Sequence, residues 1–186
     1  MNYKIVTCFN EKKLKKNTFK LLNEFKENWQ PNIEFHCYYY DLDISNYSLP
    51  QADNIKYHKL ESIAEYSTFV EENQKHNGTE DGTVQYTELL DGLSAAPEVF
   101  AISECGFENE DCWLLWVDPM CLTVKDIRTS TLDTYFPNTS YNVDFVYTPE
   151  TSYLMAFNLS RQTAVDIMGD WRGSYMSGEY INYREW

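Results

Sequence analysis

The sequence has few of the residues and patterns that mark several large protein classes. Only seven of its 186 residues are glycine, and it contains neither the G-x-G-x-x-G pattern of dinucleotide-binding folds nor the G-x-x-x-x-G-K-[ST] pattern of P-loop proteins. The nucleophile elbow of serine hydrolases is also absent. No apolar run reaches 18 residues, and no charged-then-apolar leader precedes a small-residue cleavage site. We therefore expect a soluble, cytoplasmic protein with no membrane partner.

Metal-ligand and disulfide spacings are missing too. The five cysteines include no C-x-x-C pair and lie mostly in apolar surroundings, which predicts free, packed thiols. The three histidines, His36, His58 and His76, do not have the spacing of metal ligands. We expect a core or surface role for each of them.

Charge is distributed unevenly along the chain. Residues 1–30 carry seven Lys and three Asp or Glu, whereas the remainder is strongly acidic and brings the formal net charge to −14. So acidic a body repels DNA, RNA and anionic lipid, and we expect no nucleic-acid partner. The cluster of Lys12, Lys13, Lys15 and Lys16 is expected to be the solvated face of one helix, with direct phosphate binding as the alternative.

The first forty residues follow a strand–helix–strand pattern. Residues 3–8 alternate as a strand, and apolar side chains at helical spacing run from Leu14 to Trp29 after Asn10, a suitable N-cap. Pro31 closes this helix, and residues 33–40 form the next strand. Such a unit implies a parallel pair with a right-handed crossover.

Further elements are predicted downstream by the same periodicities. In chain order they are a short strand at 54–58, a helix at 60–70, a helix from Leu89 to Ile102 interrupted at Pro97, strands at 144–147 and 150–159, and a last helix capped by Ser160 and ended by Gly178. At this length the chain is expected to be one domain over residues 1–186.

The stretch from Trp113 to Leu122 is the centre of the predicted sheet. Residues 113–117 are all apolar or aromatic, which is typical of a strand buried on both faces, and they run directly into Asp118 and Pro119. In open α/β sheets, ligands gather at the carboxyl ends of strands. Asp118 therefore has two interpretations: it brackets the turn, or it holds a metal ion or a substrate hydroxyl.

This stretch resembles the central strand of GT-A-fold nucleotide-sugar glycosyltransferases, in which Trp-hydrophobic-Asp-x-Asp ends the strand. The resemblance implies an α/β, GT-A-like domain with a central, mostly parallel (mixed) sheet flanked by helices. It also implies a nucleotide-sugar donor and a divalent cation, manganese or magnesium, held by paired aspartates. Here Met120 takes the second position, and a thioether is a poor ligand for either ion.

Other segments resemble a small subgroup of this family often found in bacteriophage genomes. The opening matches in Val6-Thr7, in Trp29 with Pro31, and in Tyr39-Tyr40-Asp41. The Glu150–Leu159 segment resembles the Glu-Thr-Gly-Phe-x-x-Phe-Asn strand that lines the acceptor side. The subgroup continues past the position of Trp186 into a His-Asp pair, which leaves a C-terminally truncated chain open as an expectation.

The resemblance also implies roles for individual residues. Asp118 would be the metal ligand and a catalytic donor contact, Glu150 the candidate base or acceptor contact, and Thr7 and Thr151 donor contacts. Basic residues that resemble donor-phosphate contacts in the subgroup are replaced here. Their positions hold Ser94, Pro97 and Glu98, and a carboxylate facing a diphosphate costs free energy.

Two functional hypotheses follow. The first is a glycosyltransferase with impaired metal use, which moves a sugar from a nucleotide-sugar donor to an unknown acceptor. The second is a pseudo-glycosyltransferase without catalytic activity, acting as a phage-type protein-binding or virion-associated module. In that case the acidic body and the fifteen tyrosines would form the surface that binds a protein partner, since tyrosine is enriched in interfaces.

Overall fold

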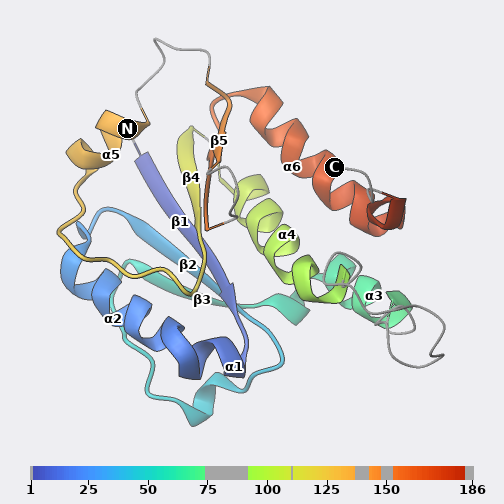
Figure 1. Ribbon diagram of the computed structural model, residues 1–186, viewed down its shortest axis with the longest axis horizontal. Coiled ribbons are helices and arrows are strands. Elements are labelled where there is room, and N and C mark those ends of the chain that lie inside the picture. The colour runs from blue at the N-terminus through green and yellow to red at the C-terminus, as the bar shows by residue number, and fades with distance from the viewer. Residues whose placement is uncertain (1, 74–91, 110, 137–142, 148–152, 183–186) are drawn as a thin grey trace.

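The computed structural model describes residues 2–73, 92–109, 111–136, 143–147 and 153–182. They form a six-stranded sheet with helices on both faces (Figure 1). The strands are β1 (Asn2–Phe9), β2 (Glu34–Tyr39), β3 (Ile55–Lys59), β4 (Cys112–Val117), β5 (Phe145–Tyr147) and β6 (Leu154–Asn158). The α-helices are α1 (Glu11–Lys13), α2 (Phe19–Asn28), α3 (Ala64–Asn73), α4 (Gly92–Phe107), α5 (Thr129–Tyr135) and α6 (Gln162–Met176).

The strand order is β3-β2-β1-β4-β6-β5. Strands β1 to β4 are parallel to one another, and β6 pairs antiparallel with both β4 and β5. The expected α/β architecture with a mixed, mostly parallel sheet is therefore confirmed. Residues 113–117 form an inner strand with β1 on one side, as the apolar run predicts.

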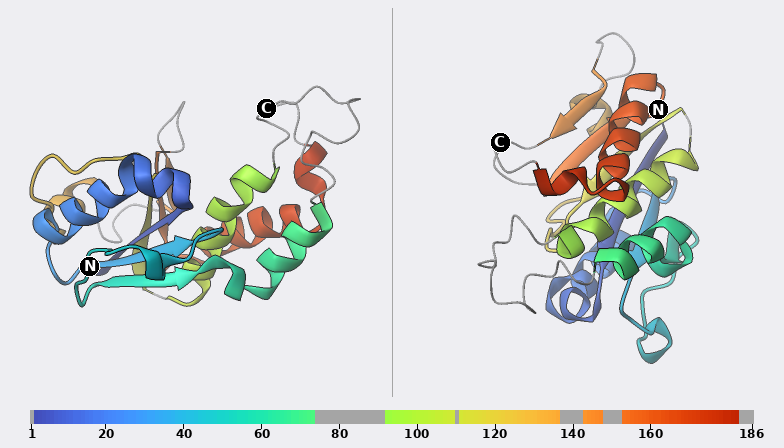
Figure 2. Two further views of the ribbon diagram at one scale, coloured as in Figure 1. Left: turned by 90° about the horizontal axis from the view of Figure 1, so that it is seen from below. Right: turned by 90° about the vertical axis from the view of Figure 1, so that its right-hand side faces the viewer.

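Helices cover the two faces of the sheet in separate groups. Helices α1, α2 and α5 lie on one face, and α3, α4 and α6 lie on the other (Figure 2). Each face has its own apolar core, and alternate residues of β4 serve both: Leu114 and Trp116 face α4, whereas Trp113 and Leu115 face α2. The unbroken apolar run of β4 is the consequence of burial on both faces.

The first crossover forms as its sequence predicts, with one local change. The side chain of Asn10 accepts a hydrogen bond from the backbone N–H of Lys13 and so caps α1. Between α1 and α2 the helix widens into a π-helical segment, Leu14–Thr18. Leu14, Leu21 and Leu22 pack onto the sheet at the predicted helical spacing.

The predicted interruption at Pro97 is wrong. Gly92–Phe107 is one helix, and Pro97 lies in its second turn, buried. The ring removes only the N–H that would bond back to Leu93, close to the helix start, so the loss affects a single early hydrogen bond. Leu89 and Leu90, which belong to the same predicted helix, lie outside the described residues.

The predicted cap of the last helix is also wrong. The N-cap of α6 is Arg161, without a side-chain cap bond, because the Ser160 hydroxyl donates instead to Asn158 Oδ1 at 2.6 Å. Gly178 does end the helical segment, with a φ of +75° that favours glycine. A short 3-10 helix, Glu179–Asn182, follows.

Arg172 ties α6 to α3 and α4. Its guanidinium lies 2.9 Å from Glu104 Oε2 and 3.2 Å from Glu65 Oε2, and it sits over the ring of Phe100. These contacts satisfy a buried charge, which would otherwise be costly. The three helices of this face therefore have a fixed arrangement. Within the described segments, no helix is both long and apolar enough to cross a bilayer.

Candidate functional site at the β1–β4 switch point

The chain changes direction at the carboxyl ends of β1 and β4. From β1 it moves outward to β2 and β3, then returns through α3 and α4 to form β4 on the other side of β1. The β1–β2 crossover through α1 and α2 and the β3–β4 crossover through α3 and α4 therefore lie on opposite faces of the sheet (Figure 1). In open α/β sheets this topological switch point is where ligands bind.

Asp118 follows β4 at this point and brackets the turn. Its Oδ1 accepts a hydrogen bond from the backbone N–H of Met120 at 2.7 Å, and its carbonyl accepts one from Cys121 N–H at 2.9 Å. Its own N–H donates to the carbonyl of Tyr153 at 2.9 Å, which joins the end of β4 to the start of β6. The Oδ2 atom of this half-buried carboxylate makes no hydrogen bond within the described part of the chain.

Glu98 reaches the same place from α4. Its pKa is raised to about 7: burial raises it most, the positive charge of Lys13 lowers it in part, and the carboxylate of Asp118 adds to the rise. Glu98 is half-buried and makes no hydrogen bond or ion pair with a described residue. Near neutral pH it is therefore poised between the charged and the uncharged form.

Lys13 differs from the other lysines of its cluster. Lys12, Lys15 and Lys16 are exposed, as predicted, and Lys15 pairs with Glu11 at 2.8 Å. Lys13 is half-buried, and its charge acts on both Glu98 and Cys8. Because Asn10 caps the first turn through the Lys13 N–H, the start of α1 is fixed beside the switch point.

Cys8 and Thr7, at the end of β1, point to opposite faces. Cys8 is fully buried in the α4 core beneath Glu98 and Asp118, and burial raises the pKa of its thiol. Thr7 is also fully buried and alternates with Cys8, so it faces the α2 side. Its Oγ1 has no hydrogen-bond partner among the described residues. Thr7 thus lies beneath the switch point and not on its surface.

The acceptor-side candidates cannot be compared with this geometry. Glu150 and Thr151 lie outside the described residues, so their predicted roles stay predictions. Tyr153, just beyond them, is exposed and bonds through its carbonyl to Asp118.

The residues present do not fit a resident divalent cation. Over the described ranges, no group of three or more His, Cys, Asp or Glu side chains is arranged to hold a metal ion. At the switch point, Asp118 already uses one oxygen for its turn, and the thioether of Met120 is a soft group. Glu98 is a described carboxylate whose charge acts with that of Asp118, and burial favours its uncharged form.

Sequence reasoning named Lys13 only as one of a lysine cluster with phosphate binding as an alternative, and Glu98 only as a replaced donor-phosphate contact; it did not group the two with Asp118. For Lys13 the available signal was its place three residues after the N-cap Asn10, which sets it in the first turn beside the end of β1. For Glu98 the signal was a carboxylate between Pro97 and Val99, which are both buried. The expectation that Glu98 only repels a diphosphate is incomplete, because a carboxyl with a pKa of about 7 is largely uncharged below that pH.

Comparison with known proteins gives no match to a family model and no match to a curated protein sequence. Among solved structures, the chain is similar to apo mouse xyloside xylosyltransferase 1, with 11% identity, a TM-score of 0.55, and coverage of 99% of this chain and 77% of that one. It is also similar to the apo glycosyltransferase GlyE of Streptococcus pneumoniae TIGR4, with 10% identity and a TM-score of 0.52. That match covers 91% of this chain and 37% of the longer protein. Identities this low show the fold alone, and the fold is the GT-A-like fold of glycosyltransferases.

Proposed function

We propose that this protein transfers a sugar from a nucleotide-sugar donor to an acceptor hydroxyl at the β1–β4 switch point. The observation that carries the proposal is the meeting of Lys13, Glu98 and Asp118 at this point of a GT-A-like fold. These three charged groups come from three separate elements, and a structural role explains only the Asp118 turn. A carboxyl with a raised pKa, such as Glu98, in such a place is typical of functional sites.

The proposed step is a single displacement. The acceptor oxygen bonds to the anomeric carbon of the donor sugar, the bond from that carbon to the diphosphate oxygen breaks, and the diphosphate leaves with the electron pair. Glu98 in its carboxylate form takes the acceptor proton, a role suited to a pKa near neutrality. Asp118 Oδ2 accepts a hydrogen bond from a donor-sugar hydroxyl, and Lys13 balances charge on the departing diphosphate.

The proposal assigns charge balance to Lys13 and not to a cation held by Asp118. A cation bound by the donor would supply further charge neutralisation, but the described residues do not form a set of ligands for it. Thr7 is proposed to support the donor site from beneath, since it is fully buried next to the end of β1. Glu150 and Thr151 are proposed to contact the acceptor side, and the location is proposed to be the cytoplasm of a cell or of a bacteriophage host.

One observation favours the second hypothesis, a pseudo-glycosyltransferase that binds a protein partner. Asp118 already accepts the Met120 N–H, an interaction that keeps the turn folded without any ligand. The acidic, tyrosine-rich surface would then be the binding surface, with Tyr135 and Tyr147 among its exposed members. Under this hypothesis the fold is retained without turnover.

The test is an activity assay on the wild type, Asp118→Asn and Asp126→Asn. Purified protein is incubated with a panel of nucleotide sugars, with and without manganese, and release of nucleoside diphosphate is measured. Asp126→Asn is the matched control because Asp126 is exposed in the loop beyond the turn. We expect D118N to abolish release and D126N to match the wild type, since Asn lacks the charge that polarises a sugar hydroxyl.

Two results would contradict the enzyme hypothesis. One is no release by the wild type with any donor of the panel. The other is equal release by the wild type and D118N. In the first case, capture of a protein partner that weakens when Tyr135 and Tyr147 are replaced would support the second hypothesis.

A further inference from the structure

A cavity of about 380 Å³ opens on α6 beside the switch point. It is lined by Asp170, Trp171, Ser174, Tyr175 and Tyr180. Helix α6 runs antiparallel to α4, so the end of α6 lies next to the start of α4, which carries Glu98 (Figure 1). The volume is within the roughly 300–1,000 Å³ range of small-molecule sites, and the lining combines aromatic rings with a few polar groups, as such sites do.

The aromatic wall of the cavity is rigid. The rings of Tyr175 and Tyr180 are stacked with centroids 4.7 Å apart and planes inclined by 11°. Phe69 of α3 packs against both rings, at 5.6 Å and 5.7 Å. The Tyr180 hydroxyl donates to Asn73 Oδ1 at 3.1 Å. The wall is therefore fixed before any ligand arrives, which lowers the entropy cost of binding.

Two polar groups at the cavity have no partner in the described part of the chain. The Tyr175 hydroxyl makes no hydrogen bond to a described residue, although the ring is half-buried. Asp170 is exposed and forms no ion pair with a described residue. By contrast, the Ser174 hydroxyl is already used, since it donates to the Trp171 carbonyl at 2.7 Å. The cavity thus offers one hydroxyl and one carboxylate to a ligand.

The cavity lies near the proposed reaction centre, because α6 packs along α4, the helix that carries Glu98. Burial raises the pKa of Tyr175 to about 12, and the negative charge of Glu98 contributes to that shift. Glu98 is in turn within electrostatic reach of Asp118 and Lys13. A ligand on the Tyr175 face would therefore present its hydroxyls towards Glu98.

The charges around the cavity select the ligand. Asp170 and Glu98 are both acidic, and the nearby Arg172 is neutralised by Glu65 and Glu104. A phosphate or carboxylate group would be repelled here. A neutral pyranose has apolar C–H faces that pack on aromatic rings, and it has hydroxyls that donate to a carboxylate.

We propose that the Asp170–Trp171–Tyr175–Tyr180 cavity is the acceptor subsite and that it binds a neutral carbohydrate, with one of its hydroxyls directed at Glu98. The assignment of the bound sugar as the acceptor rests on the proposed function, whereas the assignment of a carbohydrate site rests on the cavity alone. The carboxylate of Asp170 accepts hydrogen bonds from the sugar, and the rings of Trp171 and Tyr175 contact its C–H face.

The experiment measures binding of methyl β-D-glucopyranoside, methyl β-D-galactopyranoside and lactose by saturation-transfer NMR, without donor. Glucose 6-phosphate is the charged counterpart. The variants are Asp170→Asn, which removes the negative charge, and Tyr175→Phe, which removes the hydroxyl, each keeping the shape of the side chain; Asp126→Asn and Tyr147→Phe are matched controls outside the cavity. Thermal unfolding of each variant verifies that the fold is intact.

We expect the wild type to bind at least one neutral sugar. Y175F should weaken that binding about five- to tenfold because a hydrogen bond to the ligand is lost, and D170N should weaken it by a similar factor because its hydrogen bond is no longer charge-assisted. Glucose 6-phosphate should bind the wild type worse than glucose, and D170N should narrow that difference. The controls should bind like the wild type. Equal binding by D170N, Y175F and the wild type would overturn the proposal, as would the absence of any sugar binding.

Failure of this proposal and failure of the proposed function are distinguishable. If the wild type releases diphosphate from a nucleotide sugar but D170N and Y175F bind sugar as the wild type does, only the subsite proposal is wrong. If sugar binding depends on Asp170 and Tyr175 but no donor is turned over, the cavity stands as a carbohydrate site and the transferase proposal is wrong.

Discussion

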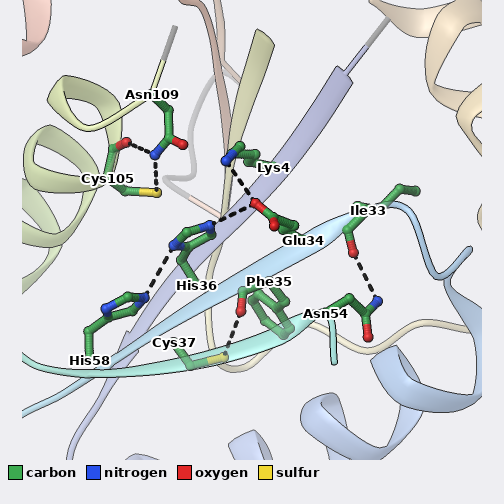
Figure 3. A network of polar contacts seen from close by, with 10 residues as sticks. All are labelled: Lys4, Ile33, Glu34, Phe35, His36, Cys37, Asn54, His58, Cys105 and Asn109. Atoms are coloured by element: carbon green, nitrogen blue, oxygen red, sulfur yellow. Dashed lines mark hydrogen bonds and ion pairs between the residues drawn. The ribbon is translucent and has the colours of Figure 1, made fainter. Parts of the chain in front are cut away.

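Two clusters of charged residues lie at opposite ends of the central strands, and each includes or adjoins a residue of helix α4. At the carboxyl ends of the strands, Lys13, Glu98 and Asp118 act on one another through their charges, without an ion pair within 4 Å between described residues. Nearer the amino ends, Lys4 and Glu34 begin a chain of direct contacts that continues through two histidines (Figure 3). The charges of the second cluster have ion-pair partners in direct contact, whereas those of the first do not among the described residues.

The amino-end cluster is connected atom to atom. Lys4 Nζ lies 2.7 Å from Glu34 Oε2, which lies 3.5 Å from His36 Nε2, and His36 Nδ1 lies 3.2 Å from His58 Nε2 (Figure 3). The rings of His58 and Tyr38 are stacked. Burial lowers the pKa of His36 to about 4, so its ring is neutral at neutral pH. Its Nδ1 contacts His58, whereas its Nε2 makes no hydrogen bond with a described residue.

The difference indicates where the molecule can accept a ligand. A half-buried polar network whose members contact one another contributes to a unique fold. Its charged groups are already paired, so few of them are available to a substrate. Half-buried charges without direct partners raise the free energy of the folded protein, and such unfavourable arrangements concentrate at functional sites. The following predictions test this distinction, from the largest expected effect to the smallest.

After the loss of release expected for D118N, the largest effect is expected from Glu98→Gln. Gln keeps the size of the side chain but cannot take a proton, so the rate of sugar transfer should fall about 100-fold or more. Glu71→Gln, an exposed change on α3, is the control and should leave the rate unaltered. Steady-state kinetics on the donor that the wild type turns over provides the measurement. A rate loss below about threefold would remove Glu98 from the mechanism.

The pH dependence of the wild type should report the same group. Because Glu98 has a pKa of about 7 and acts as a carboxylate, kcat/KM should rise about tenfold between pH 6 and pH 8. The charged and titratable groups facing it are Lys13, Asp118, Cys8 and Tyr175, and the raised pKa values of Cys8 and Tyr175 keep those two uncharged throughout this range. In E98Q the rise should vanish. A profile with the same inflection in E98Q would assign it to another group.

Lys13→Gln should affect donor binding more than chemistry. Removal of one half-buried positive charge should weaken binding of a nucleoside diphosphate about tenfold, which calorimetry can measure. Lys12→Gln is a close control, since Lys12 is the adjacent residue of the same helix and is exposed. Added salt should reduce the K13Q effect only in part, because a half-buried pair is screened less than an exposed one. Equal weakening by both substitutions would mean that the whole lysine cluster acts as a diffuse positive field.

The histidine network should respond to acid through stability and not through activity. The pKa of His36 is lower in the fold than its usual value of about 6.5, so the unfolded chain binds the proton first as the pH falls. The free energy of unfolding should therefore drop by about 1–2 kcal/mol between pH 7 and pH 5. The neighbouring charges are Lys4, Glu34, His58 and Glu108, and His58 adds to the slope because its pKa is also lowered.

Denaturant titrations of the wild type and His36→Gln would measure this contribution. H36Q should be less stable at pH 7 but should show a shallower fall towards pH 5. A slope that is identical in the two proteins would show that His36 titrates in the fold as it does in the unfolded chain.

Periodicity in the sequence is enough to predict most of the fold. Burial on a definite face explains three patterns: the alternation of residues 3–8, the helical stripe from Leu14 and the apolar run ending at Val117. Each buried position requires an apolar residue, so the pattern can be seen in the sequence. The failures at Pro97 and Ser160 have local causes. One is the small cost of a missing early N–H, and the other is a competing acceptor on Asn158.

The site was predictable only in part. Asp118 could be identified because the apolar run of a buried strand ends directly before it, and ligands bind at the carboxyl ends of such strands. Lys13 and Glu98 depend on how α1 and α4 pass the ends of β1 and β4, and no spacing within the chain encodes that approach. In the same way, His36 and His58 meet because β2 and β3 pair with Tyr38 opposite His58, a register that residue spacing does not specify.

The smallest effect is expected for stability in Asp118→Asn. The amide Oδ1 of Asn can accept the Met120 N–H as the carboxylate does, so the turn should persist and the free energy of unfolding should change by no more than about 0.5–1.5 kcal/mol. Asp118→Ala removes the acceptor and should cost more than Asn, because the Met120 N–H then loses its partner. If D118N keeps the wild-type unfolding curve while diphosphate release disappears, Asp118 acts on a ligand through Oδ2 in addition to bracketing the turn through Oδ1. If D118N and D118A destabilise equally and release follows the folded fraction, Asp118 belongs with the histidine network as a structural group, and only Lys13 and Glu98 remain candidates at the switch point.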